Sequence, residues 1–201
     1  MENIEELPEW KTGDIVLFSG RCIVGKTIRL LSRSKWSHCG MIIIDPSYDY
    51  PLLYEATKNK TLACKDLGYG IGGVQLIPLY ERIADYNGDI GIRQLEGIDL
   101  SDEALYSLYL FRKFMIGIEF EDNFMTFLAA IYPLPYTNRY GDIRKVFCTE
   151  LIAQVYMEMG LLDRLPPSNK YAPSFFDEVR GNKLKKGYLG SEILIKLKGS
   201  K

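Results

Sequence analysis

The sequence predicts an α+β protein in which an antiparallel sheet or partial barrel packs against a late helix. Two observations lead to this class. Short apolar segments with strand character follow one another in the first half of the chain, and the gaps between them are too short for the helical crossovers that parallel strands need. Residues 147–160, in contrast, have the apolar spacing of a helix. The strands therefore pair mostly with their sequence neighbours.

The expected strands are short and are separated by turn residues or by one helical segment. KTIRLLS (26–32) forms a helical or turn connection after the first strand, and DPSYDYP (45–51) has turn chemistry. Pro78 places its strand at a sheet edge or at a break. The predicted strands are GDIVLF (13–18), SHCGMIIID (37–45), LLYEAT (52–57), GVQLIPLYERI (73–83), DIGIRQL (89–95) and SEILIKLK (191–198).

Two longer helices are expected. SDEALYSLYLFRKFM (101–115) has an N-cap serine, early acidic residues and helical apolar spacing. In FCTELIAQVYMEMG (147–160), Gly160 stands where a helix stops. The apolar residues that share one face of this second helix are Leu151, Ile152, Val155, Tyr156 and Met159.

Composition and charge exclude several functional classes. The chain of 201 residues is 47% hydrophobic and 25% charged, with a formal net charge of −1, so no general attraction to nucleic acid is expected. The start is polar, and no apolar run is long enough to span a membrane. We expect a soluble, cytoplasmic, single domain over 1–201, with a polar lead (1–10) and a disordered tail (199–201). The lysines of NKLKKGY (182–188) are expected to be solvated, with peripheral membrane contact as the less favoured alternative.

The cysteines show neither a CxxC pair nor a regular framework. Because His38 is the single histidine, no zinc site is expected, and no cofactor is predicted. We interpret the cysteines as reduced. Cys22, Cys39 and Cys64 are expected to be small buried apolar residues, which leaves Cys148 as the candidate for chemistry.

One motif suggests a different class of protein. Residues 18–31 contain the pattern of a phosphate-binding loop, formed by Gly20, Gly25, Lys26 and Thr27, and Asp45 ends a later strand where a magnesium ligand could stand. Such loops lie in parallel α/β sheets, whereas strand–helix alternation does not follow here. A nucleotide hydrolase is therefore an alternative that the pattern leaves open but does not favour.

The favoured chemistry is that of a cysteine nucleophile. Cys148 lies at the first position of the 147–160 helix, where free backbone N–H groups and the helix dipole lower a thiol pKa. His38 is the only imidazole base available. If strands 37–45 and 52–57 form a hairpin folded about Pro46 and Ser47, His38 and Glu55 lie directly opposite each other on one sheet face. Glu55 would then orient the imidazole, as the third member of a triad does.

These residues carry a resemblance to a known family. In order, GDIVLFSG, IRLLSRSKWSHCGMII, LYEAT, GIEFEDN, VFCTELIAQVY and YAPSFFDE resemble the circularly permuted papain-like enzymes of the NlpC superfamily, the YiiX/YaeF type. The resemblance implies a papain-like fold whose histidine strand precedes its cysteine helix. It implies that Cys148 is the nucleophile, His38 the base and Glu55 the orienter of a triad acting on amide bonds. It also places the phosphate-loop letters on a connector.

The resemblance further implies an active-site tyrosine shortly before the cysteine. Ile143 stands five residues before Cys148, so Tyr136 and Tyr140 are the candidates. The family includes peptidase-like, amidase and acyl-transfer activities, and the resemblance does not choose among them.

We therefore expect a cysteine-dependent hydrolase that cleaves a peptide, isopeptide or N-acyl amide bond through an acyl-thioenzyme. Backbone N–H groups of Cys148 and Thr149 would hold the oxyanion. A set of aromatic residues forms either ordinary core or a groove for an acyl chain, which would favour a lipid amidase or acyltransferase: Phe120, Phe124, Phe127, Tyr132 and Tyr136. A domain that binds a peptide, an amino-acid amide or an acyl-lipid without turnover is a third alternative.

Overall fold

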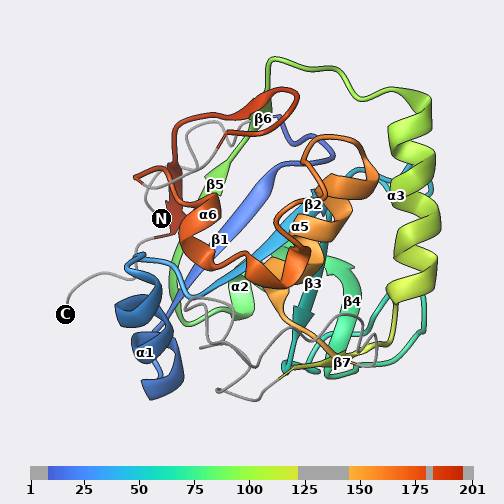
Figure 1. Ribbon diagram of the computed structural model, residues 1–201. Coiled ribbons are helices and arrows are strands. Elements are labelled where there is room, and N and C mark those ends of the chain that lie inside the picture. The colour runs from blue at the N-terminus through green and yellow to red at the C-terminus, as the bar shows by residue number, and fades with distance from the viewer. Residues whose placement is uncertain (1–8, 122–144, 180–182, 197–201) are drawn as a thin grey trace.

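The computed structural model describes residues 9–121, 145–179 and 183–196. Within these residues the main feature is an eight-stranded sheet in which every neighbouring pair is antiparallel except β7 and β8 (Figure 1). The strand order along this sheet is β10 (Ile193–Lys196), β5 (Gly88–Arg93), β1 (Ile15–Gly20), β2 (His38–Ile43), β3 (Leu52–Thr57), β4 (Gly73–Pro78), β7 (Glu119–Phe120) and β8 (Lys145–Val146).

The remaining elements surround this sheet, and the mixed α+β class expected from the sequence is confirmed. A small second sheet pairs β6 (Leu95–Glu96) with β9 (Tyr188–Leu189). The helices are α1 (Ile23–Ser32), α2 (Leu79–Asp85), α3 (Asp102–Met115), α5 (Cys148–Glu158), the short 3-10 helix η1 (Ser168–Lys170) and α6 (Pro173–Phe176). Within the described segments, no helix has both the length and the apolar character needed to cross a bilayer.

One predicted strand is wrong in part. The segment 73–83 was expected to be extended throughout, but β4 ends at Pro78 and α2 begins at the next residue. Pro78 lacks a backbone N–H and has a φ of −61°, so it can stand directly before a helix without losing a hydrogen bond. The Leu79 N–H then donates to the Pro51 carbonyl at 3.0 Å, which fixes the start of α2 beside β3.

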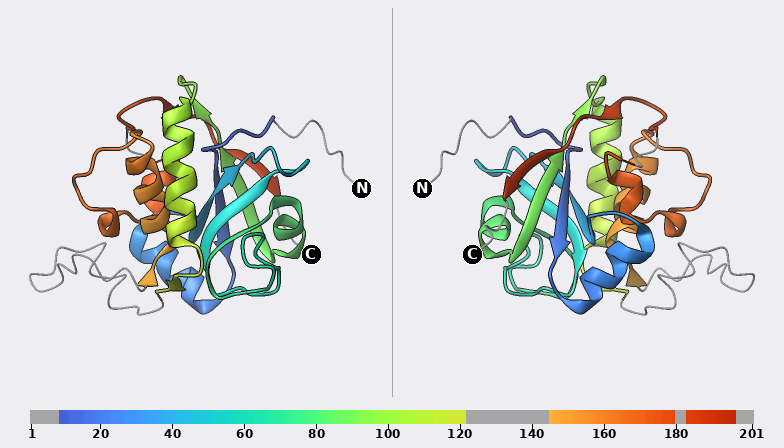
Figure 2. Two further views of the ribbon diagram at one scale, coloured as in Figure 1. Left: turned by 90° about the vertical axis from the view of Figure 1, so that its right-hand side faces the viewer. Right: turned by 90° about the vertical axis from the view of Figure 1, so that its left-hand side faces the viewer.

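The sheet has a buried core on both faces. Alternate residues of β1, β2, β3 and β4 contribute to a large cluster beneath α5 and α3, and the intervening residues contribute to a smaller cluster beside α2. Figure 2 shows α3 and α5 on one side of the sheet and α2 on the other. The apolar face predicted for α5 is confirmed, since all its members are buried: Leu151, Ile152, Val155, Tyr156 and Met159.

The phosphate-loop letters lie on the connector α1. Both neighbours of β1, namely β2 and β5, are antiparallel to it. The Cys22 sulfur caps α1 by accepting from the Gly25 N–H at 3.3 Å, and the Lys26 N–H donates to the Cys22 carbonyl. These amides are therefore used inside the helix. His38 begins β2, whereas Asp45 follows the other end of that strand, where its carboxylate pairs with Arg112. Asp45 therefore does not stand where the magnesium ligand of a phosphate loop would.

The terminal regions were also assigned from the sequence. Residues 1–8 of the polar lead and the tail 199–201 lie outside the described residues. The basic segment near the C-terminus has the exposed lysines that were expected, namely Lys183, Lys185 and Lys186.

Candidate active site

The hairpin formed by β2 and β3 pairs in a different register from the predicted one. Met41 lies opposite Tyr54, and Ile43 lies opposite Leu52, so the pairing is offset by two residues from a fold about Pro46 and Ser47. The prediction that His38 and Glu55 are directly opposed is therefore wrong. The reason is that the turn between the strands is longer and is centred later in the chain than was assumed. Because side chains alternate with a period of two, the offset leaves both residues on the predicted face.

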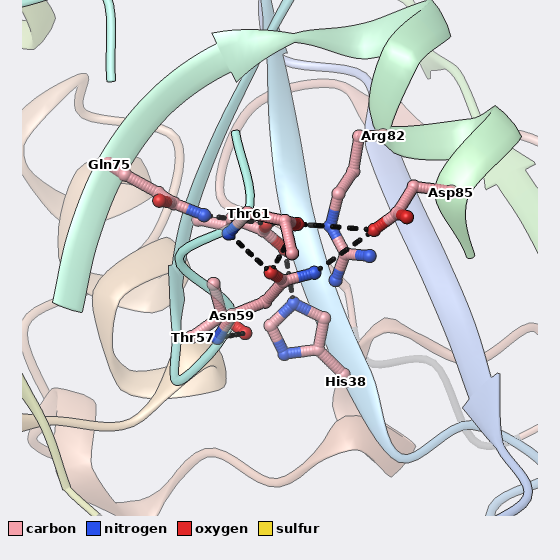
Figure 3. Close-up of polar contacts among 8 residues, drawn as sticks. His38, Thr57, Asn59, Thr61, Gln75, Arg82 and Asp85 are labelled. Atoms are coloured by element: carbon pink, nitrogen blue, oxygen red, sulfur yellow. Dashed lines mark hydrogen bonds and ion pairs between the residues drawn. The ribbon is translucent and has the colours of Figure 1, made fainter. Parts of the chain in front are cut away.

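His38 and Glu55 nevertheless meet. His38 Nε2 lies 2.6 Å from Glu55 Oε2, and the Glu55 side chain is fully buried. The other carboxylate oxygen of Glu55 accepts from Arg82 Nε at 2.8 Å and from Gln75 Nε2 at 3.2 Å. Figure 3 shows His38, Gln75 and Arg82 converging from β2, β4 and α2. Glu55 is therefore held in place by three donors from three elements.

Neighbouring elements position the partners of Glu55. Gln75 is the cross-strand neighbour of Glu55 on β4. The Arg82 guanidinium projects from α2 and stacks over the rings of Phe18 and Tyr86, with centroid distances of 5.0 and 5.2 Å. The Phe18 ring also packs against the His38 imidazole at 5.3 Å. These ring contacts pack both side chains against the aromatic rings of neighbouring elements.

Cys148 completes the cluster from the other side of the sheet. It is the first residue of α5, which packs on β2 and β3. The Cys148 thiol lies close enough to the His38 imidazole and to Cys39 for these groups to shift its pKa. Because Glu55 engages Nε2, Nδ1 is the ring nitrogen that remains for the sulfur. Cys148 is 7% exposed and the His38 side chain 15% exposed, so the pair is reachable from solvent while being mostly desolvated.

Each ionised group of the cluster favours the ionised form of its neighbour. The Cys39 hydrogen bond and then the imidazolium of His38 lower the pKa of Cys148 well below its usual value, against the opposing effect of burial. Burial alone would lower the pKa of His38, but the Cys148 thiolate and Glu55 outweigh it and raise that pKa to about 9. Burial would raise the pKa of Glu55, but Arg82 and His38 lower it to about 2. The arrangement therefore favours a thiolate–imidazolium pair at neutral pH.

The other predicted site residues have different positions. Thr149 is buried at the start of α5, and its hydroxyl donates to the Tyr171 carbonyl at 2.7 Å. The Thr149 hydroxyl is thus engaged within the fold. Phe120 is partly buried and packs edge-on against Phe147. The remaining candidates lie outside the described residues: Tyr136, Tyr140, Phe124, Phe127 and Tyr132.

Sequence reasoning missed three members of the cluster and misplaced one cysteine. Pairing strand 52–57 with the next strand would have placed Gln75 beside Glu55. Arg82 was missed because its segment was predicted to be a strand, whereas it lies on helix α2. Cys39 is buried as predicted, yet it also contacts the nucleophile candidate. Cys22 was expected to be buried, whereas it is exposed and caps α1.

Among the described residues, no group of three or more His, Cys, Asp or Glu side chains is arranged to hold a metal ion. His38 has the Glu55 carboxylate and the two thiols as neighbours, and the Gln75 amide and the Arg82 guanidinium contact Glu55.

Fold and site together define a class: a mixed α+β protein with a buried Cys–His–Glu cluster between an antiparallel sheet and a helix N-terminus. No family model matches the sequence, and no curated protein is similar enough to match. Among solved structures, the chain is similar to the crystal structure of the metalloprotein YiiX from Escherichia coli O157:H7, with a TM-score of 0.52 and 22% identity over 90% of this chain and 87% of that one. A likeness at this identity shows a shared YiiX-like fold. The word metalloprotein belongs to the description of that protein.

Proposed function

We propose that the chain is a cysteine-dependent hydrolase of permuted papain-like architecture that cleaves a peptide, isopeptide or N-acyl amide bond. The supporting observation is that Cys148 at the start of α5 lies beside the His38 imidazole, whose Nε2 is 2.6 Å from Glu55 Oε2. A nucleophile hydrogen-bonded to a base, with the base oriented by a third group, is the arrangement that activates a thiol.

In the acylation step, the Cys148 thiolate attacks the carbonyl carbon of the scissile amide and forms the C–S bond. The carbonyl oxygen becomes an oxyanion, which the backbone N–H groups of Cys148 and Thr149 would stabilise, each by roughly 3 kcal/mol. The His38 imidazolium then transfers its proton to the amide nitrogen, the C–N bond breaks, and the amine leaves. Glu55 keeps the imidazole oriented toward the sulfur throughout.

In the deacylation step, neutral His38 removes a proton from a water molecule, and the resulting hydroxide attacks the thioester carbonyl. The C–S bond breaks, the carboxylic acid leaves, and the thiolate and imidazolium are restored. Buried Glu55 and Arg82 form an ion pair whose opposite charges cancel. The thiolate compensates the charge of the His38 imidazolium, so no net charge is left in the core.

The proposal is tested by replacing the nucleophile. We expect Cys148→Ala and Cys148→Ser to abolish release of amine from a panel of N-acyl amides and short peptides, while circular dichroism remains that of the parent. Cys22→Ser is the matched control, because serine caps a helix as well as cysteine does and residue 22 lies outside the cluster. Retained turnover in a folded Cys148→Ala protein would contradict the proposal.

A second measurement distinguishes an enzyme from a binding domain with the same fold. A thiolate at Cys148 should react with iodoacetamide at mildly acidic pH, where ordinary thiols are protonated. Mass spectrometry of the parent protein should locate the label at Cys148, and not at exposed Cys22. A protein in which Cys22 reacts first would lack the activated nucleophile that the proposal requires.

A further inference from the structure

Helix α1 presents part of its apolar surface to solvent, since Ile23, Val24 and Leu30 are exposed while Ile28 and Leu31 are half-buried. The residues that it buries are Gly25 and Ser32, about two turns apart on one side. A Cβ atom at Gly25 would lie 2.8 Å from the Gly20 carbonyl oxygen, so this side is in close contact with the end of β1. The opposite side presents Ile23, which is 82% exposed, and Leu30, which is 77% exposed.

The apolar surface of α1 is larger than these two side chains. Val24 is 62% exposed and extends the same surface along the first turn. A surface helix of a globular protein normally turns its apolar stripe toward the core. The three exposed apolar side chains of α1 therefore indicate a surface that is covered when the protein performs its function.

Cationic side chains surround this apolar surface. The sequence from Ser19 to Ile44 contains no acidic residue. Lys26 and Arg33 are exposed on α1 and at its C-terminal end, and Arg29 hydrogen-bonds to the neutral Ser19 hydroxyl, which leaves its charge uncompensated by that contact. The exposed apolar residues are thus flanked by the cations Lys26 and Arg33, while Arg21 at the start of the connector pairs with Asp89 at 3.8 Å.

Both ends of the α1 connector lie beside the candidate active site. The chain leaves the sheet at Gly20 and returns at Ser37, and the Gly20 N–H donates to Ser37 Oγ at 2.9 Å. Ser37 directly precedes His38, and Phe18 is the cross-strand neighbour of His38. Figure 1 shows α1 at the same end of the sheet as the start of β2, on the opposite side of α5 from α3.

We infer that α1 docks on an anionic phospholipid membrane, with Ile23, Val24 and Leu30 inserted among the headgroups and the cations contacting lipid phosphates. A basic amphipathic helix can also be bound by an acidic protein groove, but such a groove surrounds most of the helix. Only the outer side of α1 is accessible, because its inner side is fixed against β1. A convex row of apolar tips bordered by cations fits the plane of a bilayer interface. The inference rests on the surface of α1 and is independent of the proposed chemistry.

The test uses the full chain with Cys148→Ala, so that membrane binding is measured without turnover. We expect it to co-sediment with vesicles of equal parts phosphatidylserine and phosphatidylcholine, and far less with phosphatidylcholine alone. Ile23→Ser with Leu30→Ser should weaken the partition coefficient at least roughly tenfold. Lys26→Glu should weaken it on the order of tenfold, and only for the anionic vesicles.

The matched control is Tyr106→Ser with Phe114→Ser, which removes two exposed aromatic side chains (62% and 63%) from α3 and should leave binding unchanged. A fluorophore attached to exposed Cys22 supplies a readout that needs no α1 substitution, and its emission should shift to the blue on anionic vesicles. The inference is overturned by equal binding to both vesicle types, by an equal loss in the α3 control, or by an unshifted fluorophore. A dimer that light scattering detects and that Ile23→Ser with Leu30→Ser abolishes would also overturn it, since α1 would then contact a second copy.

Discussion

At the scale of single residues, Glu55 shows how a buried carboxylate can serve a candidate active site. A lone carboxylate with no exposed surface would be protonated or would destabilise the fold. Arg82 and Gln75 hold one of its oxygens, which leaves the other for His38. The ion pair with Arg82 is what permits Glu55 to remain charged beside the imidazole.

Replacing Arg82 tests this account. Arg82→Gln leaves Glu55 buried with too few cationic partners, so its pKa should rise from about 2. We expect about 3 kcal/mol lower stability to urea, on the order of tenfold lower kcat/KM, and an acidic limb of the pH–rate profile shifted to higher pH.

Arg112→Gln is the control for that experiment. Arg112 is equally buried and is paired with Asp45 at 3.1 Å and with Asp66 at 3.5 Å, away from His38. The Arg112→Gln variant should lose about as much stability to urea as Arg82→Gln does, and it should keep the pH–rate profile of the parent protein. Identical profiles for the two variants would show that Arg82 has only a structural role.

The raised pKa of His38 predicts an alkaline limit. His38 must be protonated to give a proton to the leaving amine, so kcat/KM should fall as the pH rises through about 9. The stability that the charged imidazole contributes is fully present below the unfolded value of 6.5 and is lost as the pH rises through about 9. A pH–rate profile and urea midpoints across this window test both parts. An activity limit near 6.5 would mean that Cys148 and Glu55 do not hold the proton on His38.

At the scale of elements, the helix α1 depends on a close backbone approach. Gly25→Ala should raise helix propensity by up to about 1 kcal/mol, yet its Cβ would lie 2.8 Å from the Gly20 carbonyl oxygen, inside van der Waals contact. We expect a net destabilisation of about 1–2 kcal/mol in thermal unfolding.

The control is Thr27→Ala, which raises the propensity of the same helix and removes only the local hydrogen bond from its hydroxyl to the Ile23 carbonyl. It should be neutral or slightly stabilising. If Gly25→Ala stabilised the protein as much as Thr27→Ala, α1 would not be packed closely against β1.

The elements also show what the sequence could and could not predict. Short apolar runs bounded by turn residues predicted β1, β2, β3 and β5, and these strands are buried on both faces. The register of the β2–β3 hairpin was missed by two residues, since turn length is set by local contacts that alternation does not encode. The sheet face shared by His38 and Glu55 was still predicted correctly, because an offset of two residues leaves each side chain on the same face. Helix α2 was missed because its residues continue the apolar pattern of β4, and only the missing N–H of Pro78 marks the boundary.

The meeting of Cys148 with His38 could not be predicted from spacing. The two residues are far apart in the chain, and their contact depends on how α5 crosses β2 and β3. The position of a cysteine at a helix start and the presence of a single histidine made the pair plausible, and the family resemblance selected it. Cys39 was predicted to be a core residue. A hydrophobic pattern shows which sheet face a side chain occupies, but it does not show which residues that side chain contacts.

At the scale of the whole molecule, Arg93 ties the C-terminal segment to the sheet. Its buried guanidinium donates to four backbone carbonyls of that segment: Phe176, Asp177, Leu189 and Gly190. Arg93→Gln should leave several of these carbonyls unsatisfied and lower stability by about 3 kcal/mol or more. Urea unfolding measures the loss, and limited proteolysis should cut residues 173–190 first.

The control for Arg93 is Arg164→Gln, which breaks an exposed ion pair with Glu158 and should cost less than about 1 kcal/mol. Equal losses in the two variants would mean that the carbonyl contacts of Arg93 contribute little to holding the segment.

The series Cys148, His38, Glu55 and Arg82 has a consequence for the response to salt. Its formal charges alternate in sign and sum to zero when the sulfur and the imidazole are ionised, so the cluster exerts little field beyond its immediate neighbours. Ionic strength should then hardly alter the rate for a small uncharged amide. Any strong dependence on ionic strength would have to originate on the outer surface, where counterions have access.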